Sequence, residues 1–264
     1  MLGESPVTDP CRFGDKPVPG YDFSVTIAEA QIVAPQDFLI PKHGAGNFIR
    51  GQWGKYLHQN DPDLYRQIFS PPRTTEGPSG LSDPPRPFVL RVRDWEGKPV
   101  RDGQILRFRL HLFSSIKAKG ISPKQYLKLN LDHPPTVCEL KLTFLTPTEF
   151  KGGEPWHFAA LLARVRDRVS TLRSLYQGGP LAVDFVDLGE KARTIETSFQ
   201  DLSRIVGQRR SGTNQQIHPL SGWVGTVRFR GDLSPFIPLF QIAEYTGIGR
   251  HTVWGQGEIK IARE

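Results

Sequence analysis

The sequence predicts an α+β fold made of two similar units in tandem. Two observations support this fold: short runs of alternating apolar and polar residues recur in both halves, and in each half such a run precedes apolar residues at helical spacing. The segment His133-Pro134-Pro135 interrupts regular structure between the halves. We therefore expect an N-terminal arm or loop over residues 1–21, a first domain over 22–135 and a second domain over 136–264.

The first domain is predicted to begin with a strand over residues 22–33. Its alternation changes phase midway, which indicates a possible bulge. Apolar residues at helical spacing predict a helix over 45–59, and alternation predicts two strands over 87–93 and 103–113. The lysine-rich region 114–135 is expected to bridge the two halves.

The second domain shows the order strand, helix, two strands, helix and strand, which is the order of a ferredoxin-like unit. The predicted elements are strands over 136–147, 192–206, 222–230 and 257–262, a helix over 156–176, and a helix that begins at Asp232 as N-cap and runs into a glycine-rich loop. The first domain shows a truncated version of this order. We therefore predict two ferredoxin-like units, the second with the glycine-rich loop.

The arginines of the 156–176 helix are expected to be solvated; they are Arg164, Arg166, Arg168 and Arg173.

The composition favours nucleic acid as a partner. Lysine and arginine total 34 against 27 aspartates and glutamates, so the formal charge is +7, which attracts polyanions. The sequence has no long apolar run and no signal-peptide pattern, so we expect a cytoplasmic protein without a membrane partner. Cys11 and Cys138 are far apart and lack a paired-cysteine motif, so no disulfide framework or thiolate zinc site is predicted. We expect any chemistry to proceed without a metal or another cofactor.

One predicted strand has a basic face. In residues 103–113, Arg107, Arg109 and His111 share one side of the strand, and apolar residues occupy the other side. The basic side is either a solvated face or a contact for RNA or DNA.

Four glycines lie between Gly247 and Gly257, with Arg250 and His251 among them. Glycines let the backbone approach a ligand closely, so a phosphate cradle is one interpretation, and a simple turn between a helix and the last strand is the other. The pattern is not a dinucleotide fingerprint, because Thr252 stands at the third glycine position, and no Gly-Lys-Ser/Thr sequence makes it a P-loop.

Several phrases of the sequence resemble one known family. They are Ile40-Pro-Lys-His-Gly-Ala-Gly-Asn-Phe-Ile-Arg-Gly-Gln-Trp-Gly54, Arg209-Arg-Ser-Gly-Thr-Asn-Gln-Gln-Ile-His-Pro-Leu-Ser-Gly-Trp-Val-Gly225, Phe229-Arg-Gly-Asp-Leu233 and the stretch from Gly247 to Gly257. Together they resemble the CRISPR-associated RAMP endoribonucleases, which process precursor CRISPR RNA. The sequence departs from this family in two features: it lacks a cysteine cluster that some relatives carry, and a looser phrase from Arg210 to Gln215 replaces the usual Arg-Gln phrase.

The resemblance implies metal-independent cleavage of CRISPR repeat RNA by 2′-hydroxyl attack, with the product often retained in a surveillance complex with other Cas subunits. It also implies two RAMP domains that recognise the repeat hairpin. A non-catalytic RAMP subunit that binds CRISPR RNA in an effector complex is the alternative, because the same fold and loop would support it. A third possibility is a nuclease in which Arg50 and Arg250 stabilise charge without a catalytic histidine. A generic RNA-binding module ranks last, because the sequence lacks the expected aromatic pairs on the second-domain strands.

The family that the sequence resembles usually has its catalytic histidine in the first loop and helix. The resemblance therefore makes His43 and His58 the candidates for general base or acid. Lys55 and Tyr56 are candidates for charge stabilisation or proton donation, although Tyr56 also fits the apolar stripe of the helix. We expect the first helix and the glycine-rich loop to lie together. The predicted RNA-binding residues are Arg50, Arg107, Arg109, Arg209, Arg210, Gln215, His218, Gly247, Gly249, Arg250, His251, Gly255 and Gly257.

Overall fold

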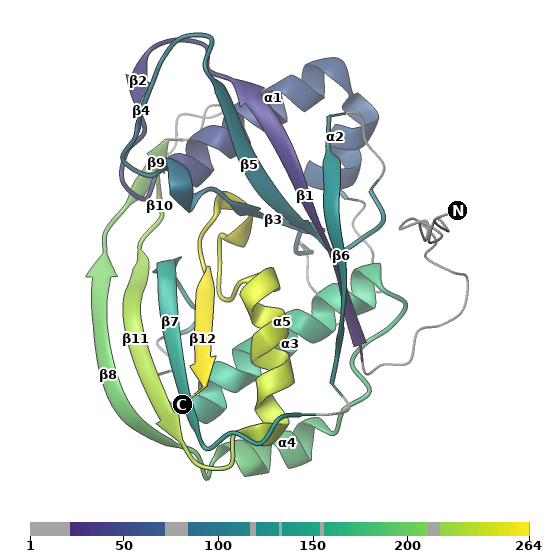
Figure 1. The fold of residues 1–264 in the computed structure, drawn as a ribbon, viewed down its shortest axis with the longest axis vertical. Helices are drawn as coiled ribbons and strands as arrows, with labels where there is room; N and C mark the ends of the chain where they lie inside the picture. Colours follow the sequence, from purple (N-terminus) through teal and green to yellow (C-terminus); the bar gives the residue numbers. More distant parts are fainter. Residues whose placement is uncertain are drawn as a thin grey trace, which may run out of the picture.

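The computed structural model describes residues 22–71, 84–116, 120–131, 134–153, 156–210 and 217–263. The predicted arm over 1–21 lies outside the described residues. Two four-stranded antiparallel sheets, each with its own helices, make up the molecule (Figure 1).

The first sheet has the strand order β3-β5-β1-β6. Its strands are β1 (Asp22–Val33), β3 (Phe88–Arg91), β5 (Ile105–Leu112) and β6 (Ser122–Asn130). The short strand β2 (Phe38–Leu39) and helices α1 (Ala45–Asn60) and α2 (Pro62–Phe69) connect β1 to β3. Strand β2 pairs with β4 (Pro99–Val100), which lies between β3 and β5 in the chain. This is the ferredoxin-like strand order, and the described residues between β5 and β6 form no second helix. The predicted truncated unit is therefore confirmed.

Strand β6 corrects one expectation, because it lies in the region 114–135 that was predicted to bridge the halves. Most of its side chains are exposed, and only Leu127 and Leu129 are partly buried. Apolar and polar residues therefore alternate only in the C-terminal part of this edge strand, and the first part lacks the pattern that predicts the other strands.

The second sheet has the order β12-β7-β11-β8, and it forms a complete ferredoxin-like unit. Its strands are β7 (Glu139–Thr148), β8 (Glu196–Ile205), β11 (Gly222–Arg230) and β12 (Ile259–Arg263). Helices α3 (Phe158–Tyr176) and α5 (Ile237–Thr246) contribute to one core with the inward side chains of β7 and β11, and α4 (Phe185–Ala192) follows α3. A small pair, β9 (Gln208–Arg210) and β10 (Ile217–Pro219), lies between β8 and β11 in sequence.

The start of α5 differs from the prediction. Asp232 is not its N-cap: residues Ser234–Phe236 form a 3-10 turn, and the α-helix begins at Ile237. The Asp232 carboxylate accepts a hydrogen bond from the Ser234 N–H at 3.3 Å, so it stabilises the turn that precedes the helix.

Strand β1 belongs to both cores of the molecule. Phe23 and Val25 pack into the core of the second unit, whereas Ala28, Ala30 and Ile32 pack against the helices of the first unit. The predicted change of phase marks the point at which the buried side chains of β1 change from one core to the other. The register with β6 also shifts between Ile27 and Ala28, so the expected irregularity is present at this point.

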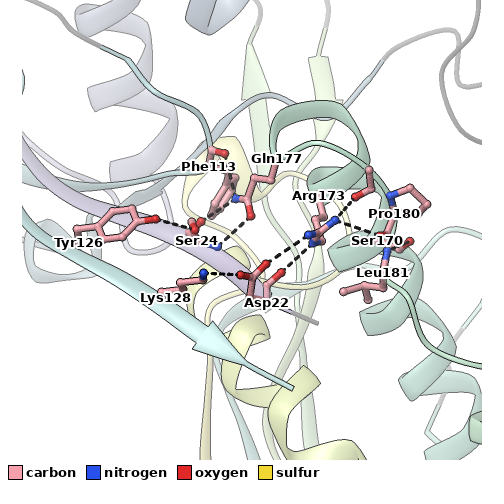
Figure 2. Close-up of polar contacts among 11 residues, drawn as sticks. Asp22, Ser24, Phe113, Tyr126, Lys128, Ser170, Arg173, Gln177, Pro180 and Leu181 are labelled. Atoms are coloured by element: carbon pink, nitrogen blue, oxygen red, sulfur yellow. Dashed lines mark hydrogen bonds and ion pairs between the residues drawn. The ribbon is translucent and has the colours of Figure 1, made fainter. Parts of the chain in front are cut away.

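A polar cluster joins the second unit to β1 (Figure 2). Arg173 of α3 is 1% exposed, and its guanidinium donates to the Asp22 carbonyl oxygen at 2.8 Å and lies 3.3 Å from the Asp22 carboxylate. Lys128 of β6 lies 2.8 Å from the same carboxylate. The side-chain amide of Gln177 donates to the carbonyl oxygens of Ser24 and Phe113. The prediction that Arg173 is solvated is therefore wrong.

Candidate active site

The glycine-rich loop connects α5 to β12 and folds tightly on itself. Gly247, Gly249, Gly255 and Gly257 all have positive φ, which side-chain-bearing residues rarely adopt. A Cβ at Gly257 would lie 2.0 Å from the Ile248 carbonyl oxygen, so the backbone approach requires glycine. The N–H groups of Gly247, Gly255 and Gly257 already donate to protein carbonyl oxygens. These bonds favour the turn interpretation for the glycines, and their contact with RNA stays a prediction.

Arg168 of α3 binds the start and the middle of this loop. Its guanidinium donates to the carbonyl oxygens of Thr246 and Gly247 at 2.8–3.1 Å and 2.9 Å, and to the Thr252 hydroxyl at 2.7 Å. Burial lowers the pKa of Arg168 to about 10, so it remains charged at neutral pH. The expectation that Arg168 is solvated is wrong, because the last turn of α5 leaves carbonyl oxygens that need donors.

Arg91 and His111 cap the same helix end from the first sheet. Arg91 donates to the carbonyl oxygens of Glu244 and Tyr245 at 2.8 and 3.0 Å, and His111 Nδ1 lies 3.0 Å from the Tyr245 oxygen. Since a carbonyl oxygen only accepts, Nδ1 carries the proton. His111 is 8% exposed, so it is not part of an open basic face.

Arg107 and Arg109 remain exposed beside this buried cluster. The Arg109 guanidinium lies 3.8 Å from the Asp94 carboxylate, and both side chains are largely solvated. The basic face predicted from the sequence is therefore present with two of its three members. Its contact with RNA stays a prediction.

The first helix and the glycine-rich loop lie together, as expected. A Cβ at Gly46 in the first turn of α1 would lie 1.7 Å from the Trp254 carbonyl oxygen. The Arg50 guanidinium lies 4.6 Å from the centre of the Trp254 ring and 4.9 Å from that of Phe69. Arg50 thus stabilises the junction through cation–π contacts, and its phosphate contact stays a prediction.

His43 lies at this junction, immediately before the N-terminus of α1. Its φ of 62° is uncommon for a residue with a side chain, and such conformations concentrate at functional sites. Burial, with a smaller contribution from Lys42, lowers the pKa of His43 below its ordinary 6.5. The imidazole is therefore neutral at pH 7 and can accept a proton.

Glu96 fixes the backbone beside His43. Its carboxylate oxygens accept hydrogen bonds from the N–H groups of Gly44 at 2.9 Å and Ala45 at 3.2 Å, where the helix dipole favours negative charge. Burial raises the pKa of Glu96, and the backbone N–H donors oppose this shift. Glu96 is not recognisable as a site residue from the sequence, because a lone acidic residue in a loop has no distinguishing local pattern.

Glu149 lies between two predicted RNA-binding side chains of the glycine-rich loop, Arg250 and His251. Its carboxylate lies 3.2 Å from His251 Nε2 and 3.3 Å from Arg250 Nη1. The His251 ring centre lies 5.3 Å from that of Trp254. Glu149 directly follows β7, and like Glu96 it has no sequence pattern that marks it as a site residue.

The other predicted catalytic residues lie toward the opposite end of α1. Lys55 and Tyr56 are exposed, so Tyr56 does not belong to the core, and the His58 ring packs against Tyr65 with ring centres 5.0 Å apart. At 1.5 Å per residue, Lys55 is about 17 Å along the helix axis from Gly44. These residues do not share a site with His43.

The remaining predicted RNA-binding residues lie on or near the β9–β10 pair. Arg209 faces His218 across this pair, Arg210 is its neighbour, and Gln215 lies outside the described residues. The Gln256 amide of the glycine-rich loop donates to the Leu220 carbonyl oxygen at 3.0 Å, just after β10. The base of the pair is thus anchored to the loop.

The fold is similar to solved Cas6 structures. Thermus thermophilus Cas6 matches with a TM-score of 0.54 and 17% identity over 92% of this chain and 98% of its own. A Cas6 product complex matches with a TM-score of 0.51 and 16% identity over 91% and 100%. The partial Cas6-RT-Cas1–Cas2 complex matches with a TM-score of 0.52 and 11% identity over 94% of this chain and 47% of that one. No curated protein sequence matches the chain.

The two ferredoxin-like units and the glycine-rich loop give this chain a fold similar to that of the solved Cas6 structures. Residues 142–259, which lie in the second unit, match the family described as CRISPR-associated endoribonuclease Cas6. Among the described residues, no helix combines the length and apolar character needed to cross a membrane. The described parts of the chain also contain no cluster of three or more His, Cys, Asp or Glu side chains suited to a metal ion.

Proposed function

We propose that this protein is a metal-independent endoribonuclease that cleaves precursor CRISPR RNA within its repeats and retains the product. The observation that carries the proposal is His43, a histidine with a lowered pKa in a left-handed conformation, at the junction of α1 with the glycine-rich loop. The Cas6 family match of the second unit supports the same reaction class.

The reaction needs a base, an acid and cations. His43 takes the proton of a 2′-hydroxyl, the 2′-oxygen forms a bond to the adjacent phosphorus, and the bond from phosphorus to the 5′-oxygen breaks. A proton donor protonates the departing 5′-oxygen, so the products are a 2′,3′-cyclic phosphate and a 5′-hydroxyl. Arg250 and His251 are the candidates to stabilise the negative charge of the phosphate and to donate this proton. Glu149 orients both side chains.

The proposed partners are the hairpin of a CRISPR repeat, its crRNA product and other Cas subunits. The similar solved structures include a Cas6 product complex and a Cas6-RT-Cas1–Cas2 complex, which supports both kinds of partner. The exposed Arg107 and Arg109, with Arg209, Arg210, Gln215 and His218 of the region around β9 and β10, are the proposed RNA contacts beyond the cleavage site.

The test is cleavage, in EDTA, of a precursor RNA that carries the repeats of the array in the same genome. Because general-base catalysis contributes about 10²- to 10⁴-fold, we expect His43→Ala to slow cleavage by at least about a hundredfold. His58→Ala should change the rate by less than about threefold, since His58 lies at the far end of α1. His157→Ala is the matched control, because His157 is exposed and has no proposed role.

The pH profile gives an independent readout for His43. Its lowered pKa means that the base stays deprotonated below pH 6.5, so the rate should fall with acid only below that value. Tight RNA binding without cleavage would make the protein a non-catalytic RAMP subunit. If His43→Ala still cleaves the RNA, the reaction does not need this histidine as a base. Arg50 and Arg250 would then stabilise the charge of the phosphate.

A further inference from the structure

A groove lies beside the C-terminal half of α1, away from the junction that holds His43. Its volume is about 390 Å³. The lining residues come from the end of β1, from α1 and from the two residues just before β6; they are Gln31, Ile32, Val33, Gln52, Trp53, Lys55, Tyr56, Leu57, Gln59, Gly120 and Ile121. We call this feature the α1 groove.

The lining of the α1 groove has the chemistry of a nucleotide site. It contains three side-chain amides, one ammonium group and no carboxylate. Tyr56 is 53% exposed, so its ring is available for stacking. The amides of Gln31, Gln52 and Gln59 can donate and accept hydrogen bonds, as the edge of a base requires.

The end of β1 adds backbone N–H and C=O groups to the α1 groove. Strand β6 pairs with β1 only from Asp22 to Glu29, so the β1 segment 30–33 has no strand partner on that side among the described residues. On its other side, Gln31 is paired with Arg107 of β5, whose side chain belongs to the exposed basic face. The groove therefore adjoins a cation that can bind the backbone of a nucleic acid.

We propose that the α1 groove binds a nucleotide of single-stranded RNA, with the base stacked on Tyr56 and Lys55 near a phosphate. This proposal rests on the proposed function in one respect, since the RNA would be a single-stranded part of the substrate or product. The groove is about 17 Å along α1 from the His43 end, which corresponds to about five nucleotides of a stacked strand. Lys55 and Tyr56 then bind RNA at a distance from the cleaved bond and take no part in its chemistry.

Binding of fluorescein-labelled decamers of oligoadenylate and oligouridylate, followed by fluorescence anisotropy at fixed salt, tests the proposal. Loss of one stacked base weakens binding about five- to hundredfold, so Tyr56→Ala should raise the Kd by that factor. Tyr56→Phe keeps the ring and should bind within about twofold of the wild type. Phe199→Ala is the matched control, because Phe199 is also a half-exposed aromatic residue but lies on β8 of the other sheet.

Photocrosslinking locates the contact. A decamer with 4-thiouridine should crosslink to a peptide that contains residues 52–59, and the crosslink should disappear in Tyr56→Ala. The proposal fails if the wild type does not bind either decamer, if Tyr56→Ala binds as well as the wild type, or if Phe199→Ala weakens binding equally. The decamers carry no repeat and need no cleavage, so this result stands apart from the outcome of the cleavage assay.

Discussion

Arg91, Arg168 and His111 bind the last four carbonyl oxygens at the C-terminal end of α5 and the start of the glycine-rich loop. The negative end of the helix dipole favours such donors. His111 differs from the two arginines because burial, followed by Arg91, lowers its pKa to about 3. It therefore acts as a neutral donor at neutral and mildly acidic pH.

This burial predicts a pH-dependent stability. Below pH 6.5 the unfolded chain binds a proton at His111 and the folded chain does not. The contribution of His111 to the free energy of unfolding therefore falls by about 1.4 kcal/mol for each pH unit of acidification. His111→Asn keeps a donor near the Tyr245 carbonyl oxygen but does not titrate. Urea unfolding should show that the free energy of unfolding falls by about 2 kcal/mol more in the wild type than in the variant between about pH 6.5 and pH 5.

The difference between the two proteins isolates His111, because every other titrating group is common to both. Parallel stability curves for the wild type and His111→Asn over this range would show that His111 accepts a proton in the folded state. The neutral donor role would then be wrong.

At the scale of elements, α1 is positioned by a glycine that has no room for a side chain. The backbone of Gly46 packs directly on the Trp254 carbonyl oxygen, whereas a Cβ added at Gly51 in the same helix would have no atom within 4 Å. Glycine is normally unfavourable inside a helix, so the two positions respond oppositely to alanine. Close packing of α1 on the loop therefore outweighs helix propensity at Gly46.

We expect Gly46→Ala to destabilise the protein by about 2 kcal/mol or more, because the added methyl group must displace either α1 or the loop. Gly51→Ala should stabilise it by about 0.5–1 kcal/mol, because only helix propensity changes. Urea unfolding measures both values. Gly46→Ala should also slow RNA cleavage, since the helix shift moves His43. Equal effects of the two substitutions would contradict the close contact with Trp254.

At the scale of the whole molecule, Arg173 holds the second unit on β1. Its guanidinium donates to the carbonyl oxygens of Asp22, Gly179 and Pro180 and to the Asp22 carboxylate. Figure 2 shows Asp22 and Pro180 on two sides of this guanidinium. Lys128 brings β6 to the same carboxylate. One buried cation thus connects α3, the loop after it and the first sheet.

Removal of this cation should destabilise the contact between the units. We expect Arg173→Ala to lower the free energy of unfolding by about 3–5 kcal/mol, because the buried carbonyl oxygens and part of the Asp22 carboxylate lose their donor. Arg164→Ala is the control on the same helix, because Arg164 is exposed. Its replacement should change the free energy of unfolding by less than about 0.5 kcal/mol. A similar small effect at Arg173 would show that the cluster does not stabilise the fold.

The sequence by itself determined the elements that bury one face. Strands β1 and β11 have the predicted bounds, and the phase change within β1 is visible in the residues because each face must match a different core. The four loop glycines were also recognisable, since only glycine fits their positive φ values and close contacts. Such features follow from local geometry, which a short stretch of sequence specifies.

Only the tertiary structure decided which charged residues are buried and which share a site. Arg168 and Arg173 have the same helical neighbourhood as the exposed Arg164, and they differ only in the carbonyl oxygens that other elements bring to them. Glu96 and Glu149 meet their partners across about 50 and 100 residues of sequence. Burial and pairing of a charge depend on distant segments of the chain, so no local pattern specifies them.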